Sequence, residues 1–239
     1  VTVGWVVVSN ATLHNEEEII RKDIRIGDHV SIQRAGDVIP QIVSVDLNKR
    51  EKNSEKYIFP TRCPSCGSQT IKEINTNTKK VDAIRRCLDK EYKCQHIAKE
   101  KLKHFVSKDA FNIDGLGKKV IDQFWELELI KMPPDIFNLD YTKIKNLEGW
   151  GDLSVKNLRN AIKDSSTISL DKFIYSLGIR HIGEENAKLI GNFFIDIKKF
   201  TELFNTSKRK NLLKNIEELD GIGLAQLKSL EDFFSNKYN

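Results

Sequence analysis

The stretch Asn112-Ile113-Asp114-Gly115-Leu116-Gly117 decides how the second half of the sequence folds, because its Gly-apolar-Gly pattern recurs. Similar stretches follow at 146–151, 179–183 and 218–223, and the second glycines stand at positions 117, 151, 183 and 223. Spacings of 34, 32 and 40 residues are typical of an internal repeat. A helical pattern follows each copy, which predicts helices over 118–130, 152–163, 184–194 and 224–234.

Each repeat has the composition of a helix-hairpin-helix motif. Glycine is needed where the turn takes backbone conformations closed to other residues, and the apolar residue between the glycines (Leu116, Trp150, Ile182 or Ile222) is expected to pack inward. The second helix begins with unpaired N–H groups that a phosphate oxygen can satisfy. One such pattern is more often an ordinary helix–helix turn. Four in series favour contact with a DNA backbone, without reading of the bases.

The repeats differ in detail. The third has His181 where the others have their first glycine, so that hairpin is expected to be distorted or to serve mainly in packing. Lys118 and Lys119 follow the first turn directly and would add charge to a phosphate contact. The glycines predicted to line the DNA are Gly115, Gly117, Gly149, Gly151, Gly183, Gly221 and Gly223.

The positive charge is concentrated in one segment. The whole chain has a net charge of +5, and residues 61–110 alone hold 12 Lys/Arg and 6 Asp/Glu. Such a segment indicates either a polyanion partner or a solvated lysine-rich surface. With 39% hydrophobic residues the chain can bury a core, and no apolar run approaches the roughly 18–20 residues that span a bilayer. The N-terminus shows no signal-peptide pattern, so we expect a cytoplasmic protein without a membrane partner.

Residues 1–60 are predicted to form a small β-barrel of the OB-fold type. Short apolar stretches separated by glycine turns indicate strands, and an inserted helix is typical of this fold. We expect that helix at 16–22, with Asn15 as its N-cap and glutamates in its first turn. The predicted strands cover 2–9, 23–26, 29–34 and 38–45.

The string Arg34-Ala35-Gly36-Asp37-Val38-Ile39-Pro40 stands out within this region. An arginine, a tight turn and an apolar pair at a strand edge would place Arg34, Val38 and Ile39 against a nucleic-acid groove. The simpler alternative is that Val38 and Ile39 are strand core and that Asp37 is a turn residue.

The basic segment also contains all four cysteines, as Cys63-x2-Cys66 and Cys87-x6-Cys94. Pro64 and Gly67 would turn backbone amides toward the thiolates. A set of four cysteines meets the tetrahedral demand of Zn²⁺ and leaves no position for a catalytic water, so the predicted zinc site is structural. Twenty residues separate the pairs, which suits two strands and a turn.

Three alternatives to this zinc site stay open. The cysteines could form two disulfides or be free thiols in a core, and His96 could replace a cysteine as a ligand. Metal binding would supply much of the stability of 61–100, which is too small to fold on apolar burial alone. The basic residues near the site suit phosphate contact; they are Lys72, Lys79, Lys80, Arg85, Arg86, Lys90 and Lys93.

The expected architecture is therefore multidomain α+β. An OB-like barrel occupies 1–60, a four-cysteine zinc finger 61–100, and an all-α array of four hairpins 101–239.

The sequence resembles the central and C-terminal part of bacterial NAD-dependent DNA ligases. The likeness rests on Ala-Thr-Leu-His-Asn at 11–15, Asp-Ile-Arg-Ile-Gly-Asp at 23–28 and the string at 33–40. The four cysteines and the four hairpins follow in the family's order. The resemblance implies three modules that close a clamp around nicked duplex DNA. It also implies that Arg34 contacts DNA near the nick and that Val38 and Ile39 press into the minor groove.

The family's adenylation domain, with its Lys-x-Asp-Gly nucleophile, is missing from this sequence. The nearest strings, at 112–115 and 218–221, lack the lysine, so we predict no catalytic residue and no activity for the chain alone. NAD and Mg²⁺ are expected to bind outside this segment. The first strand of the family's OB domain is expected to precede Val1, and the adenylation domain to act in cis or as a separate chain. We expect a monomer associated with the bacterial nucleoid.

Three hypotheses for function follow. The first is the DNA-clamping portion of an NAD-dependent DNA ligase. The second is an independent DNA-structure-binding protein built from ligase modules. The third is a zinc-stapled scaffold for protein interactions.

Overall fold

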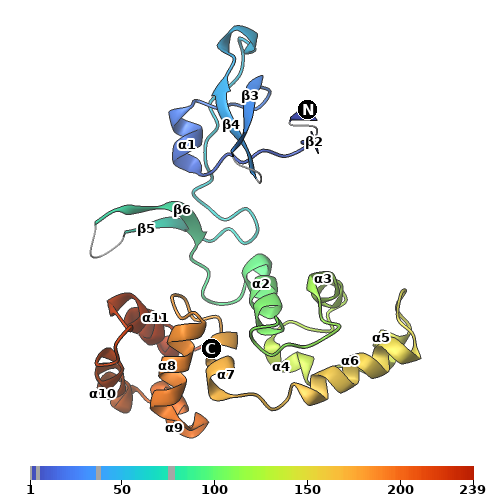
Figure 1. The fold of residues 1–239 in the computed structure, drawn as a ribbon, viewed down its shortest axis with the longest axis vertical. Coiled ribbons are helices and arrows are strands. Elements are labelled where there is room, and N and C mark those ends of the chain that lie inside the picture. Colours follow the sequence, from blue (N-terminus) through green and yellow to red (C-terminus); the bar gives the residue numbers. More distant parts are fainter. Residues whose placement is uncertain (1, 4–5, 36–38, 75–78) are drawn as a thin grey trace. The chain divides into compact units, whose positions relative to one another are not determined.

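The computed structural model describes residues 2–3, 6–35, 39–74 and 79–239. The chain separates into two compact units, residues 1–89 and 90–239 (Figure 1). The first unit holds the strands and one α-helix, and the second unit is helical. No helix within the described ranges combines the length and the apolar character that crossing a bilayer requires.

The strands described in the first unit form three separate antiparallel pairs. The predicted β-hairpin between the cysteine pairs is confirmed, whereas the N-terminal strands, as far as the described residues go, do not close into a barrel. Of the run at 2–9, the described residues include two two-residue strands, and β3 and β4 pair with each other along their length. The pairs are β1 (Thr2–Val3) with β2 (Val6–Val7), β3 (Val30–Ala35) with β4 (Ile39–Val45), and β5 (Thr70–Ile74) with β6 (Val81–Cys87).

The predicted acidic helix is present as α1 (Glu16–Arg21). The Asn15 side chain caps it by accepting the Glu18 N–H at 3.0 Å, and glutamates fill the first turn, where the helix dipole favours them. The chain on both sides of α1 is tied to β4. The Thr12 N–H donates to the Pro40 carbonyl at 2.8 Å, and the Lys22 ammonium donates to the Ile42 carbonyl at 2.6 Å.

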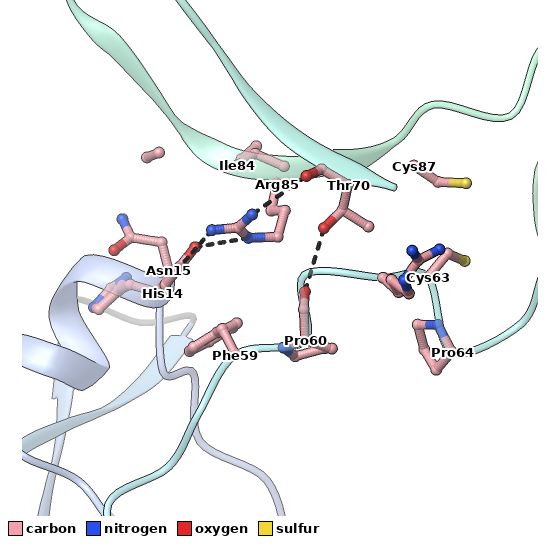
Figure 2. A pocket seen from close by; sticks show the side chains of 13 residues that line it. His14, Asn15, Phe59, Pro60, Cys63, Pro64, Thr70, Ile84, Arg85 and Cys87 are labelled. Atoms are coloured by element: carbon pink, nitrogen blue, oxygen red, sulfur yellow. Dashed lines mark hydrogen bonds and ion pairs between the residues drawn. The ribbon is translucent and has the colours of Figure 1, made fainter. Parts of the chain in front are cut away.

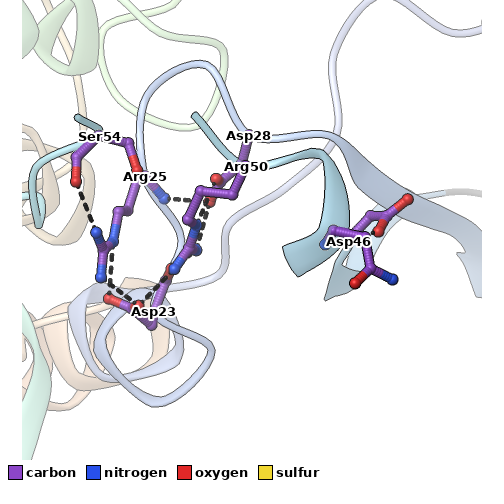
Figure 3. Close-up of polar contacts among 7 residues, drawn as sticks. Asp23, Arg25, Asp28, Asp46, Arg50 and Ser54 are labelled. Atoms are coloured by element: carbon purple, nitrogen blue, oxygen red, sulfur yellow. Dashed lines mark hydrogen bonds and ion pairs between the residues drawn. The ribbon is translucent and has the colours of Figure 1, made fainter. Parts of the chain in front are cut away.

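The strand predicted at 23–26 is wrong, because this stretch consists of turns. Asp23 has a left-handed backbone with φ +47°, which a strand does not tolerate. Figure 3 shows why: the Arg25 and Arg50 side chains converge on Asp23 and Asp28. Arg50 donates to Asp28 at 2.8 Å and to Asp23 at 2.7 Å, and the Asp28 side chain is only 1% exposed. Side-chain pairing therefore fixes the backbone here in place of a strand ladder.

Because of this ion network, the stability of the first unit depends on pH. The hydrogen bond from Arg50 holds the pKa of Asp28 below its usual range, and Arg25, then Arg50, lower the pKa of Asp23 to about 2. A carboxyl with a depressed folded-state pKa stabilises the fold above its unfolded pKa of about 3.9, and that stabilisation is lost as the pH falls through the folded value.

We therefore expect Asp28→Asn to lower the free energy of unfolding by about 2 kcal/mol at neutral pH, because it leaves a buried guanidinium short of one partner. The difference from the parent chain should shrink as the pH falls through the depressed pKa of Asp28. Urea unfolding followed by circular dichroism measures both. Asp46→Asn is the matched control, since Asp46 pairs with the exposed Lys49 and asparagine keeps its capping oxygen. Equal stability of the Asp28 variant and the parent would contradict the network's role.

The second unit contains the helices that the repeats predict. The helices after the second and fourth glycine patterns extend one residue beyond prediction, and the third matches it. The first is shorter than predicted, because Glu128 is left-handed (φ +57°) and the Leu129 N–H turns back to the Phe124 carbonyl at 2.9 Å. The helices are α2 (Gln95–Phe105), α3 (Lys118–Glu126), α4 (Pro133–Ile136), α5 (Tyr141–Lys145), α6 (Asp152–Asp164), α7 (Leu170–Ser176), α8 (Glu184–Phe194), α9 (Ile197–Thr201), α10 (Thr206–Glu217) and α11 (Leu224–Ser235).

The helices form two successive apolar cores. The α2–α3 and α5–α6 pairs contribute to the first core, in which Leu102, Ile121 and Phe124 are fully buried. The α7–α8 and α10–α11 pairs contribute to the second, with Phe200 and Leu230 at its centre. Each repeat thus supplies two helices, and each core takes two repeats.

One residue at the end of α8 is strained. Ile195 is β-branched and 80% exposed, yet its φ is +62°, a conformation that favours glycine. We expect Ile195→Gly to raise the free energy of unfolding by about 1 kcal/mol. Ile197→Gly, which places glycine at the regular first position of α9, should lower it. Thermal unfolding of both variants tests this, and a less stable Ile195→Gly chain would contradict it.

Candidate nucleic-acid interface and metal centre

The four repeats share one turn. In each, the apolar residue between the two pattern positions donates its N–H to the carbonyl three residues earlier; the donors are Leu116, Trp150, Ile182 and Ile222, at 3.1–3.3 Å. The residue before each donor is left-handed, with φ +89° at Gly115, +81° at Gly149, +60° at His181 and +96° at Gly221. The third turn therefore has the geometry of the others, and the expectation that it is distorted is wrong.

Contacts around His181 hold this unfavourable conformation in place. Its Nδ1 lies 3.1 Å from the Ser229 hydroxyl of α11, and the Asn186 side chain donates to its carbonyl at 3.0 Å. A non-glycine residue keeps a left-handed backbone when its surroundings fix it. The contact with Ser229 ties the third repeat to the fourth, in line with the expected packing role.

The second glycines are the N-caps of α3, α6, α8 and α11. Each has an extended backbone, and its carbonyl accepts the first helical hydrogen bond at 2.9–3.1 Å. A Cβ added at Gly117, Gly151 or Gly183 would meet no described atom within 4 Å. Neither backbone conformation nor internal packing therefore requires glycine at these three positions.

The apolar residues between the glycines point inward, as predicted. Leu116, Ile182 and Ile222 are buried. Trp150 is half-buried against Phe124, with the ring centroids 5.4 Å apart. They anchor the turns to the two cores.

The four helix starts differ in charge and capping. α3 begins with the exposed Lys118 and Lys119 and has no side-chain cap among the described contacts. α8 begins with Glu184 and Glu185. The Gly151 N–H is taken by Ser154 at 2.9 Å and the Gly223 N–H by Gln226 at 3.2 Å. The start of α3 is therefore the most favourable of the four for an anion.

The four cysteines form the metal-compatible group that the sequence predicts. The sulfur atoms of Cys63, Cys66, Cys87 and Cys94 lie within 4.8 Å of one another, and His96 is not among the group. None of the four is joined in a disulfide within the described residues, which favours the metal site over the disulfide alternative. Tetrahedral Zn–S bonds of about 2.3 Å place sulfurs roughly 3.8 Å apart, and Cys66 and Cys87 are separated by 3.5 Å. The donor set and its spacing fit Zn²⁺.

Local geometry prepares the thiols. Gly67 is left-handed (φ +74°), so its N–H reaches the Cys63 carbonyl at 2.8 Å and closes the knuckle. Hydrogen bonds from Ser68 lower the pKa of Cys66 to about 7, whereas burial raises the pKa of Cys87 to about 12. The Asp89 N–H donates to the Cys87 sulfur at 3.4 Å. A divalent cation would supply the charge that lets all four thiols ionise.

We expect the purified chain to contain about one equivalent of zinc, and Cys66→Ser to lose it together with amide protection in β5 and β6. Elemental analysis and hydrogen exchange measure the two effects. Ser65→Ala is the matched control, because the buried Ser65 hydroxyl has no hydrogen-bond partner among the described residues. Full zinc content in the Cys66 variant would contradict the four-thiolate site.

Several basic residues expected to meet phosphate are instead paired within the first unit. Figure 2 shows the Arg85 guanidinium with its hydrogen bonds drawn as dashed lines. Arg85 and Lys72 both contact Glu16, at 3.1 and 3.2 Å, and this bonding, Arg85 first, lowers the pKa of Glu16. Arg86 pairs with Asp82 at 3.3 Å. No sequence spacing indicated Glu16, which lies more than fifty residues from either partner.

Next to this ion pair lies a pocket of about 380 Å³. His14, Phe59, Pro60, Ile84 and Arg85 are among its walls (Figure 2). The pocket lies between the chain around the start of α1 and the β5–β6 hairpin. The polar contacts of Glu16 join these two segments at one side of the pocket.

The described residues of the string at 34–40 lie at the end of the β3–β4 pair. Arg34 lies opposite Pro40 and Ala35 opposite Ile39 in the register. Ile39 is 57% exposed, which contradicts its assignment to a strand core. Val38 lies outside the described residues, and of Arg34 only the place in β3 is described.

Comparison with known proteins supports the OB-fold prediction for the N-terminal region, although its described strands do not form a closed barrel. Residues 1–54 match the family model described as the NAD-dependent DNA ligase OB-fold domain. Over all 239 residues the chain is 58% identical to a DNA ligase of Pelagibacter ubique, of which it covers 35%. It is 45% identical to a DNA ligase of Parvibaculum lavamentivorans and 44% identical to one of Wolbachia pipientis, again over its full length, covering 34% and 35% of those proteins.

The chain is therefore ligase-related. Over its full length it is similar to a segment of bacterial proteins named DNA ligase, and its first 54 residues match the OB-fold domain of the NAD-dependent enzymes, so the resemblance drawn from its motifs is confirmed to that extent. It spans about a third of the length of these relatives.

Proposed function

We propose that the chain is the DNA-gripping part of an NAD-dependent DNA ligase. It binds nicked duplex DNA so that the 5′-phosphate and the 3′-hydroxyl are aligned for sealing by an adenylation domain. The observation that carries this proposal is the fourfold repetition of one turn, whose capping glycines at 117, 151 and 183 face open space. Glycine at a position that the chain itself does not require indicates close approach by another molecule.

Each turn acts as a helix-hairpin-helix motif. The left-handed residue turns the chain, the apolar residue anchors it in the core, and the helix that follows directs its first N–H groups outward. A phosphate oxygen accepts from these groups and is attracted by the helix dipole. Lys118 and Lys119 make the first motif the strongest contact. The acidic start of α8 makes the third the weakest, so that repeat contributes mainly packing.

The first unit adds contacts near the nick. Arg34 and Ile39 lie at the end of the β3–β4 pair. The exposed apolar side chain of Ile39 suits insertion into the minor groove. Val38 is assigned the same role from the sequence. Bound zinc would be held by Cys63, Cys66, Cys87 and Cys94 and would supply a structural crosslink for the β5–β6 hairpin.

Positioning is a large part of catalysis in phosphoryl transfer. Alignment of the reacting groups converts an encounter into an effectively unimolecular step, and the protein's contribution is mainly placement and charge stabilisation. In this proposal NAD and Mg²⁺ bind to the adenylation domain, present in cis or as a separate chain. The chain acts as a monomer on nucleoid DNA in the cytoplasm, and it supplies placement and no covalent chemistry.

The proposal predicts salt-dependent binding that is sensitive to one charge at the first turn. If about five phosphates are neutralised, log K for nicked duplex should fall against log salt with a slope of roughly −4 to −5. Gly117→Asp should weaken binding about tenfold at low salt and flatten the slope by about 1, because a carboxylate would face the phosphate. Fluorescence anisotropy with a labelled nicked duplex measures both quantities.

Gly117→Asn is the matched control. Asparagine and aspartate cap helices equally well, so the two variants differ only in charge. A salt-independent affinity would favour a protein scaffold. Equal affinity of the two variants would remove the first turn from the interface. Radiolabelled NAD should leave no adenylate on the chain, and a labelled adduct would overturn the division of labour.

A further inference from the structure

The Glu16 carboxylate holds two cations of the cysteine-bearing hairpin. Its two oxygens receive the Arg85 Nη2 and Nε groups at 3.1 and 3.2 Å, and the Lys72 ammonium lies 3.2 Å away. Arg85 is on β6 and Lys72 on β5, so one side chain of α1 engages both strands. The forked arginine contact fixes direction as well as distance.

This contact is more shielded than the surface pairs around it. The side chains of Glu16, Lys72 and Arg85 are 12%, 16% and 25% exposed. The adjacent Glu17 is 61% exposed, and its nearest oxygen lies 3.5 Å from the Lys72 ammonium, farther than that of Glu16. Solvent screens a shielded pair less than an exposed one, and loss of one partner leaves the other charge without compensation.

The chain on both sides of α1 is fixed to the β3–β4 pair. Lys22 donates to the Ile42 carbonyl, and His14 Nε2 lies 2.8 Å from the Gln41 side-chain oxygen. Thr12 forms a parallel bridge with Gln41. α1 is therefore the connection between β4, which carries Ile39 at its start, and the strands that lead to Cys87.

We infer that Glu16 is a positioning residue: by holding Lys72 and Arg85 it docks the cysteine-bearing hairpin onto α1, and thereby sets the hairpin relative to the β3–β4 tip. Lys72 and Arg85 then serve internal docking and are not phosphate contacts. The pocket beside the pair explains why a latch is needed, because the space lined by Phe59 and Ile84 leaves this side of the hairpin without continuous apolar packing.

The rigidity of the hairpin then depends on charge complementarity within the protein, whether or not DNA is bound. Its consequence for DNA rests on the proposed function: the hairpin and the β3–β4 tip can bind one duplex together only while their spacing is fixed. Loss of the latch should therefore weaken DNA binding through added disorder, without removal of a direct contact.

A charge swap in the 239-residue chain tests the latch. Glu16→Arg and Arg85→Glu, each alone, should raise the hydrogen exchange rates of the β5–β6 amides about fivefold or more. Combined in one chain, they restore an acid–arginine pair with unchanged net charge and should return exchange to within about twofold of the parent. Affinity for a nicked duplex should fall in the single variants and recover in the swap.

Two controls match the charge changes. Arg21→Glu alters an exposed arginine of the same helix, which pairs with Glu18, and Arg86→Glu alters the neighbouring arginine of β6, which pairs with Asp82. Both should leave exchange in the hairpin near the parent value. Zinc content reports whether each variant keeps its fold. If the Glu16→Arg variant does not fold, Glu16→Gln removes the same charge with a milder change.

Unchanged exchange in every Glu16 variant would overturn the latch, whatever the DNA result. Recovery of exchange without recovery of DNA binding in the swap would make Arg85 a phosphate contact and refute its assignment to docking alone. If no variant, nor the parent, binds DNA while exchange follows the predicted pattern, the proposed function fails and the latch stands.

Discussion

The left-handed backbone at the third position of each repeated turn is the constraint on which the helical unit depends. It lets the next N–H close the turn, and it sends the apolar residue into the core while the following helix starts at the surface. Glycine adopts this conformation at little cost, and three of the four turns use it. His181 adopts it at a cost, held by contacts with Ser229 and Asn186. The turn geometry is thus retained even where its usual residue is not, so the geometry itself is what the packing requires.

The first unit depends on paired charges to a greater degree than on a continuous core. Arg50 with Asp28, and Glu16 with Arg85, are both poorly exposed, and each joins segments far apart in the sequence. Among its described side chains only Ile19 is a buried hydrophobic residue, whereas the second unit buries two clusters. A domain with little apolar burial needs other crosslinks; the ion pairs are such crosslinks, and the cysteine group would provide another with a metal bound. Two of the cations expected from the sequence to contact phosphate, Lys72 and Arg85, form such internal pairs.

Local patterns predicted what depends on neighbouring residues. The four helix starts, the Asn15 cap, the β5–β6 hairpin and the four-cysteine group all follow from short motifs and from the regular spacing of their copies. Failures occurred where distant side chains decided the outcome. At 23–26 the apolar alternation indicated a strand, but the ion pair of Arg50 with Asp23 holds a turn there. Lys72 and Arg85 form ion pairs with Glu16. Single-sequence periodicity holds no information on such pairings, and for the same reason barrel closure could not be judged from strand-like stretches.

The chemistry of the four helix starts is unequal, so under the proposed function the four repeats do not contribute equally to DNA binding. If all four gripped phosphate equally, an acidic first turn at α8 would oppose binding, since Glu184 and Glu185 add negative charge where the phosphate would sit. α8 instead contributes Ala187, Ile190 and Phe194 to the second core. Under the proposed function, a repeat that does not bind phosphate tolerates histidine at its turn and glutamate at its helix start, provided that its packing is preserved. The left-handed histidine and the acidic helix start of the third repeat therefore agree with one role, which is packing.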